Sequence, residues 1–151
     1  RAPGSAAMTD VVFSRALSGD TRQWQHDSAA AERAGCVAVA AADLPGHDGI
    51  VDATVAIGAT TGLPVQVAVA LPTRSPRQLV NAIGAMAALA RRPLLVGLGA
   101  GGPELLEHAH GLPWTPPLTR LREYLACVLA AVRGPGAAIP CAAAAAPHLC
   151  F

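Results

Sequence analysis

The chain has 151 residues, which suffices for one domain with a core of its own. Hydrophobic residues make up 52% of the sequence and charged residues 14%, a balance that argues against a disordered chain. The formal net charge is +1, all eleven basic residues are arginine, and no basic stripe with interleaved aromatic residues occurs. We therefore expect no nucleic-acid partner.

The four cysteines have neither C-x-x-C spacing nor histidines at zinc-ligand spacing, which favours a reduced, cytoplasmic compartment. No uninterrupted apolar run is long enough to predict a membrane-spanning helix, so we expect no membrane partner. Residues 1–7, which precede Met8, are interpreted as a cloning remnant.

The first predicted elements are a short strand at residues 11–13 and a helix over 21–34, which Gly35 ends as a typical C-terminal stop. A second buried strand is predicted over 36–40 because the run is short and apolar. Its carboxyl end leads to Asp43, in a loop rich in proline and glycine.

The middle of the chain continues this alternation of strands and helices. An alanine-rich helix over 50–60 precedes a third strand at 65–71. Pro76 then occupies the first position of a helix that runs to about Ala90, and a fourth buried strand begins at Pro93.

The last predicted elements are an amphipathic helix over 117–132 and a fifth strand over 139–145. Regular alternation of strands and helices predicts a parallel sheet with right-handed crossovers. Two architectures fit this pattern, a doubly wound open sheet and part of a (β/α)8 barrel. A complete barrel takes about 250 residues, so this chain would form part of one.

The fourth strand runs directly into a glycine-rich loop at residues 99–102. Ligands of α/β proteins bind at the carboxyl ends of the strands, so the loop is a candidate binding element. Residues 97–102 also satisfy the dinucleotide fingerprint G-x-G-x-x-G, which belongs in the first βα unit. Here three such units come first and Pro103 interrupts the helix start, so a Rossmann domain is an alternative, as is a plain tight turn.

Several short motifs occur in order along the chain: Ala31–Gly35, Arg74–Pro76, Val96–Gly101, Gly111–Trp114 and Arg120–Tyr124. In this order and spacing, over about residues 10–151, the chain resembles the bacterial luciferase-like flavin monooxygenase superfamily. The Gly-Leu-Pro-Trp and Leu-Arg-Glu-Tyr motifs look most like the branch that uses the deazaflavin coenzyme F420.

The resemblance implies a (β/α)8 barrel, of which residues 8–151 would form a single partial barrel of about five strands and four helices. It also implies an oxidoreductase or monooxygenase that acts on a small organic substrate. The cofactor, F420 or alternatively FMN, would lie at the carboxyl-terminal mouth of the barrel and carry the hydride chemistry. Because an open sheet exposes apolar edges, we expect a homodimer or a complementary barrel fragment as partner.

The resemblance also carries site residues onto this chain. Asp43 matches an acidic position at the end of the second strand and, together with His47, is the catalytic candidate. Val67-Ala68 matches a third-strand site where related F420 enzymes hold a non-proline cis peptide behind the deazaflavin ring; the alternative is an ordinary strand pair. The loop whose backbone would lie against the cofactor consists of Gly99, Ala100, Gly101 and Gly102.

Three positions depart from the family pattern: Leu44, Leu105 and Ala146, the last of which stands where the family usually has glycine. Leu44 stands where the family commonly places a histidine, and Leu105 stands where a polar residue is often found. His47 either takes over the acid/base role or is a solvated loop histidine. The departures at Leu44 and Leu105 support a second hypothesis, a non-catalytic binding or assembly subunit of the same fold.

Residues 104–110 contain two glutamates and two histidines, which raises the question of a metal site. Pro103 and Gly111 bracket the segment, and it lacks the H-E-x-x-H pattern. We therefore expect a solvated polar loop and no metal. No serine lies in a G-x-S-x-G motif, so nothing indicates a hydrolase triad.

Overall fold

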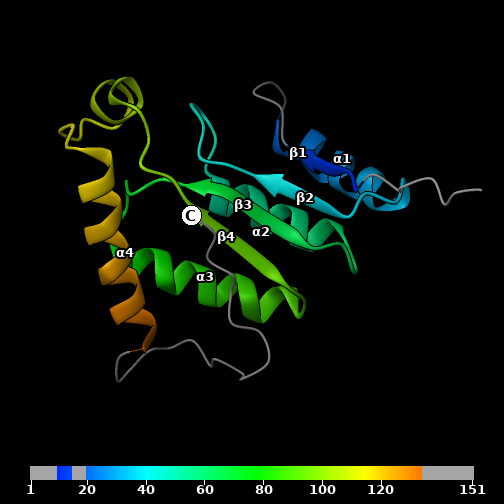
Figure 1. Cartoon of the computed structure of the whole chain (residues 1–151). Helices are drawn as coiled ribbons and strands as arrows, with labels where there is room; N and C mark the ends of the chain where they lie inside the picture. Colours follow the sequence, from blue (N-terminus) through cyan, green and yellow to red (C-terminus); the bar gives the residue numbers. More distant parts are fainter. Residues whose placement is uncertain (1–9, 15–19, 134–151) are drawn as a thin grey trace, which may run out of the picture.

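The computed structural model describes residues 10–14 and 20–133, and Figure 1 shows their arrangement. The strands are β1 (Val12–Ser14), β2 (Ala38–Ala41), β3 (Val65–Ala70) and β4 (Leu94–Leu98). The helices are α1 (Thr21–Arg33), α2 (Gly49–Ala59), α3 (Pro76–Ala90), the π-helix η1 (Glu104–Ala109) and α4 (Pro117–Arg133). None of these helices combines the length and the hydropathy that crossing a bilayer requires.

All strands of the described sheet are parallel, and they lie in the order β1-β2-β3-β4. When right-handed crossovers join strands in consecutive order, the connecting helices all lie on one face of the sheet. A doubly wound sheet instead reverses its strand order at a switch point. The described strands show no reversal, so the fold is a partial (β/α)8 barrel and the Rossmann alternative is wrong. The predicted fifth strand at 139–145 lies outside the described residues.

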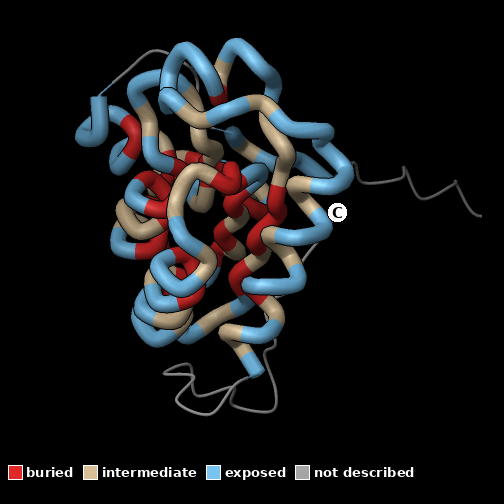
Figure 2. The backbone as a smooth tube through the Cα atoms, turned by 90° about the vertical axis from the view of Figure 1, so that its left-hand side faces the viewer, coloured by how far each residue is buried: buried red, intermediate tan, exposed pale blue. Residues whose placement is uncertain are grey.

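The core lies between the sheet and its helices, where the buried positions gather in Figure 2. Trp24 of α1 stacks on Phe13 with ring centroids 6.0 Å apart, and its Nε1 donates a hydrogen bond to the Asp52 carbonyl at 2.8 Å. Helix α2 contacts both β2 and β3, and α3 contacts α2 and α4. The strands contribute alternate aliphatic side chains with almost no exposure: Val39, Val65, Val67 and Val96.

Side-chain caps define where the helices begin and end. The carboxylates of Asp20 and Asp48 accept hydrogen bonds from the first amides of α1 and α2. Ser75 and Gln78 form a reciprocal capping box at the start of α3. Arg92 donates to the Ile57 and Thr60 carbonyls at the C-terminal end of α2.

Most element boundaries agree with the sequence prediction, but residues 104–110 do not. The expectation of a solvated loop is wrong, because 104–109 form the π-helix η1. Its glutamates and histidine are exposed, as expected, whereas Leu106 is fully buried. Leu106 is thus the one residue of η1 that is buried in the fold.

Candidate functional site

The carboxyl ends of β2, β3 and β4 meet at one edge of the sheet, which is the mouth of a barrel-type fold. Backbone hydrogen bonds continue past the strands here. The Asp43 amide donates to the Val69 carbonyl and the Gly99 amide donates to the Ala70 carbonyl, each at 3.0 Å. The loops that follow these strands are therefore held against one another, and we treat this edge as the candidate site.

Strand β3 ends in an irregular, exposed segment. A non-proline cis peptide bond joins Ala68 to Val69, one bond beyond the predicted Val67-Ala68 position. The pairing register with β4 also shifts between Val67 and Ala70. Ala68 and Val69 are exposed, whereas the Val67 side chain lies in the core, so Val67 can reach a ligand at the mouth only through its backbone.

The glycine loop after β4 packs directly against this segment. A Cβ atom on Gly99 would lie 2.4 Å from Cγ2 of Val69, so only glycine fits here without rearrangement. Gly101 has a φ of +72°, in the region that favours glycine, and a Cβ there would lie 3.3 Å from Cγ of Leu106. The loop 99–102 therefore begins against Val69 and presents mainly backbone, with few side-chain atoms.

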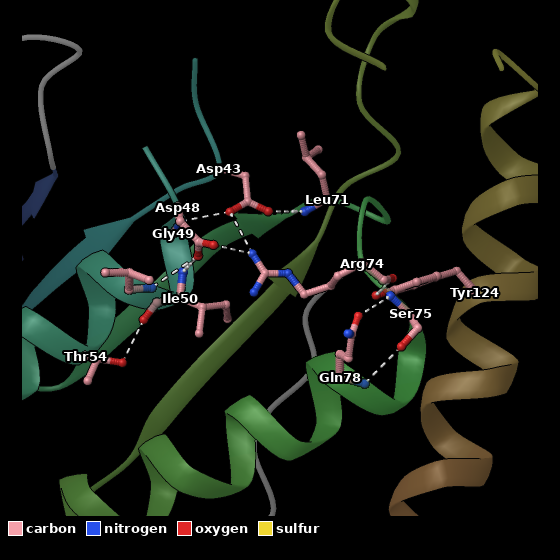
Figure 3. Close-up of polar contacts among 11 residues, drawn as sticks. Asp43, Asp48, Gly49, Ile50, Thr54, Leu71, Arg74, Ser75, Gln78 and Tyr124 are labelled. Atoms are coloured by element: carbon pink, nitrogen blue, oxygen red, sulfur yellow. Dashed lines mark hydrogen bonds and ion pairs between the residues drawn. The ribbon is translucent and has the colours of Figure 1, made fainter. Parts of the chain in front are cut away.

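Asp43 lies at the centre of a hydrogen-bond network shown in Figure 3. Its Oδ1 accepts from the Gly49 amide at 2.8 Å, and its Oδ2 accepts from the Leu71 amide at 2.7 Å. A Cβ on Gly49 would meet the Ala42 carbonyl carbon at 2.8 Å, so glycine permits this close approach. The carboxylate thus ties the start of α2 to the end of β3.

Arg74 adds a positive charge beside two carboxylates (Figure 3). Its Nη2 lies 2.8 Å from Oδ2 of Asp48 and 3.9 Å from Oδ1 of Asp43. The Tyr124 hydroxyl of α4 donates to the Arg74 carbonyl at 3.0 Å. Burial raises the pKa of Tyr124 to about 12, and the nearby Asp43 carboxylate also raises it while Arg74 opposes the shift. The phenol therefore remains a neutral donor around neutral pH.

Arg74 and Tyr124 were not among the predicted site residues. Both belong to motifs, 74–76 and 120–124, that the sequence analysis used only as markers of the family resemblance. Their positions in two recurring motifs were the signal that could have indicated a role at the mouth.

His47 lies in an ordered turn rather than in a solvated loop, so the solvated alternative is wrong. The His47 amide donates to the Leu44 carbonyl at 2.9 Å, and Gly46, which follows Pro45, has a φ of +80° typical of a type II turn. The His47 side chain is only 13% exposed, and its Nδ1 lies 3.7 Å from Oδ2 of Asp52. The turn folds back over the start of α2, and the imidazole lies beside Asp52 of that helix.

A cavity of about 550 Å³ opens between this turn and η1. Small-molecule sites commonly have volumes of about 300–1,000 Å³ and mostly apolar walls. The residues that line this cavity come from the turn and from 102–109: Pro45, Gly102, Glu104, Leu105, His108 and Ala109. Gly102 therefore belongs both to the glycine loop and to the cavity wall.

Within residues 10–14 and 20–133, no group of three or more His, Cys, Asp or Glu side chains is arranged to hold a metal ion. Glu107 of η1 accepts a hydrogen bond from the Trp114 amide at 3.1 Å, which fixes the segment that leads to α4. Glu107 thus has a local structural role.

A family model described as luciferase-like monooxygenase matches residues 18–142 of the sequence. The chain belongs to this family. The match covers every described element of the luciferase-like fold except β1. No curated protein matches the sequence significantly.

Several solved structures have a similar fold. The F420-dependent tetrahydromethanopterin reductase from Methanopyrus kandleri aligns with 85% of this chain at 17% identity and a TM-score of 0.71. The monooxygenase RslO1 from Streptomyces bottropensis aligns with 76% of it at 16% identity and a TM-score of 0.68. The oxygenating constituent of 3,6-diketocamphane monooxygenase from Pseudomonas putida, in complex with FMN, aligns with 80% of it at 15% identity and a TM-score of 0.63.

The luciferase-like chain spans about two fifths of these neighbours, namely 41%, 37% and 38% of their respective lengths. At such low identities the likeness establishes the fold.

Proposed function

We propose that this luciferase-like chain supplies the ring-binding part of a flavin- or deazaflavin-dependent oxidoreductase. F420 is the first candidate cofactor, and FMN is the second. The observation that carries the proposal is the contact between Val69 and Gly99. It places the exposed end of β3, with its cis peptide bond, against the glycine loop 99–102. The family membership supports these two candidates, as does the similar fold of an F420-dependent reductase and of a monooxygenase constituent in complex with FMN.

The described residues fit the planar ring of such a cofactor. A flat, largely apolar ring needs a surface without bulky side chains, and Ala68 together with the backbone of 99–102 offers one. Val69, 37% exposed, adds an apolar edge. A bound flavin or deazaflavin supplies the hydride acceptor or donor. The residues of this chain orient its ring and, through Val69, keep water from one side.

The cavity beside Gly102 is the proposed substrate site. Pro45, Leu105 and Ala109 give it apolar walls, which favours a small organic molecule with little charge. His47, two residues after Pro45 in the same turn, remains the proposed proton-transfer residue, although it does not itself line the cavity. Its Nδ1 lies 3.7 Å from Oδ2 of Asp52. Asp43, the other predicted catalytic residue, has both carboxylate oxygens engaged by backbone amides.

We further propose that the open sheet is completed by a second copy of the chain or by a complementary barrel fragment. The second hypothesis, a non-catalytic subunit, is favoured by Leu44 and Leu105, which stand where the resemblance would place a histidine and a polar residue.

Titration of the purified protein with F420, FMN and NAD separates these alternatives. We expect saturable binding of F420 or FMN, seen as a change in cofactor fluorescence, and turnover of the bound cofactor by a hydride donor. Binding without such turnover would favour the non-catalytic subunit. Binding of NAD alone would contradict the proposal.

A further inference from the structure

The loop after β3, residues 71–75, is held by side chains from two distant segments. The Leu71 amide donates to Oδ2 of Asp43 at 2.7 Å. From α4, the Arg120 guanidinium donates to the Pro72 carbonyl at 3.2 Å, and the Tyr124 hydroxyl donates to the Arg74 carbonyl at 3.0 Å. We call these three side chains the β3-loop clamp.

We infer that the clamp positions the exposed end of β3 for the cofactor ring, so that Asp43, Arg120 and Tyr124 are positioning residues rather than catalytic ones. The inference rests on the proposed function, because it assumes that a cofactor ring binds here. The clamp itself is defined by the hydrogen bonds alone. The Arg74 side chain forms an ion pair with Asp48 and lies near Asp43. It therefore links the loop after β3 to the loop between β2 and α2.

The geometry shows why α4 would affect the mouth. Leu71 directly follows Ala70, whose carbonyl accepts from Gly99, and Val69 packs on the same glycine. A displacement of the loop would therefore move the end of β3 relative to the glycine loop. Arg120 also donates to the Pro113 carbonyl at 2.9 Å, so the same guanidinium fixes the approach to α4.

Variants on α4 test this inference without touching the mouth. Tyr124→Phe keeps the ring and removes only the hydroxyl, and Arg120→Met keeps the aliphatic stem and removes both hydrogen bonds. Arg122→Met is the matched control because Arg122 is an exposed arginine of the same helix. Losing one such bond corresponds to a change of about 3- to 10-fold in an equilibrium constant.

Hydrogen exchange of the amides at 73–75 is measured first, without cofactor. We expect exchange to be faster in Tyr124→Phe and Arg120→Met than in the wild type and in Arg122→Met. Titrations with F420 and FMN then follow, and we expect the dissociation constant of the binding cofactor to rise about 3- to 10-fold in both clamp variants. The absorption spectrum of the bound cofactor should also shift, which a purely stabilising residue would not cause.

Unchanged exchange and unchanged affinity in both clamp variants would overturn the inference. Faster exchange with unchanged affinity and spectrum would also overturn it, because the clamp would then be structural only. A wild-type protein that binds neither cofactor would overturn the proposed function, whatever the exchange data show, so the two failures are distinguishable.

Discussion

Among the glycines of the described residues, Gly99 is the one at which an added Cβ would come nearest to another atom, and this leads to the first prediction. Gly99→Ala would place a Cβ 2.4 Å from Val69 Cγ2, so we expect a loss of about 1–3 kcal/mol in the free energy of unfolding. Gly102→Ala is the control, because nothing lies within 4 Å of its Cβ position. We expect that variant to remain within about 0.5 kcal/mol of the wild type in urea unfolding.

A double variant tests whether the clash between the added Cβ at position 99 and Val69 is the cause of the lost stability. If the clash is the reason, Val69→Ala in the Gly99→Ala background should restore most of the lost stability. A double variant as unstable as Gly99→Ala alone would contradict this explanation.

The hydrogen bonds of Glu32 lead to a prediction about how stability depends on pH. Its carboxylate accepts hydrogen bonds from the amides of Thr61, Gly62 and Leu63 at 2.7–3.1 Å. These bonds, first that from Gly62 and then that from Thr61, lower the pKa of Glu32 from 4.5 to about 2. A lowered pKa in the folded state stabilises the protein above the unfolded pKa, and that stability is lost as the pH falls toward the folded pKa.

We therefore expect Glu32→Gln to lower the urea midpoint at pH 7, and the difference from wild type to shrink as the pH falls from about 4.5 to about 2. Glu123→Gln, at an exposed position of α4, is the control, and its urea midpoint should equal that of the wild type over the whole pH range. A Glu32→Gln difference that stays constant over this pH range would contradict the assignment.

At the residue scale the sequence predicted which segments reach the mouth, but not how their side chains are used. The positions of Asp43 and 99–102 followed from strand ends, because parallel strands bring their carboxyl ends together. The engagement of Asp43 by two amides depends on Gly49, the first residue of α2, and on Leu71, which directly follows β3. No local pattern contains that information.

At the element scale, Arg92 joins the end of α2 to the loop before β4. It donates to the Ile57 and Thr60 carbonyls and to the Thr60 hydroxyl. We expect Arg92→Ala to cost about 1–3 kcal/mol, because it leaves the last carbonyls of α2 without a charged donor. Arg91→Ala, at the exposed neighbouring position, should cost less than about 0.5 kcal/mol, and equal losses in the two variants would contradict the capping role.

Elements with clear signals were predictable from the sequence. The helix at 76–90 has both a capping box and a proline at its first position, and the strand at 94–98 is a short apolar run. The helix η1 was not predictable, because only Leu106 of the six residues ELLEHA is buried and the segment is too short to show a periodic apolar face. Its formation depends on tertiary contact between Leu106 and the glycine loop.

At the scale of the whole molecule, the consecutive strand order distinguishes a partial barrel from a doubly wound sheet. The sequence pattern could not distinguish these two architectures, because strands and helices alternate in both. The partial barrel leads to the expectation of assembly: analytical ultracentrifugation should show a species of at least twice the mass of one chain, or a stable complex with a complementary fragment. A monomer at all concentrations would contradict the proposed assembly.

The central claim is that the carboxyl ends of β2, β3 and β4 hold a flavin or deazaflavin ring. Backbone amide resonances recorded during titration with F420 and FMN test it most directly. The account predicts that the largest chemical-shift changes fall at Ala68, Val69 and 99–102, with little change at the opposite end of the sheet near 61–63. Saturable shifts confined to other parts of the chain, or no shifts with either cofactor, would contradict it.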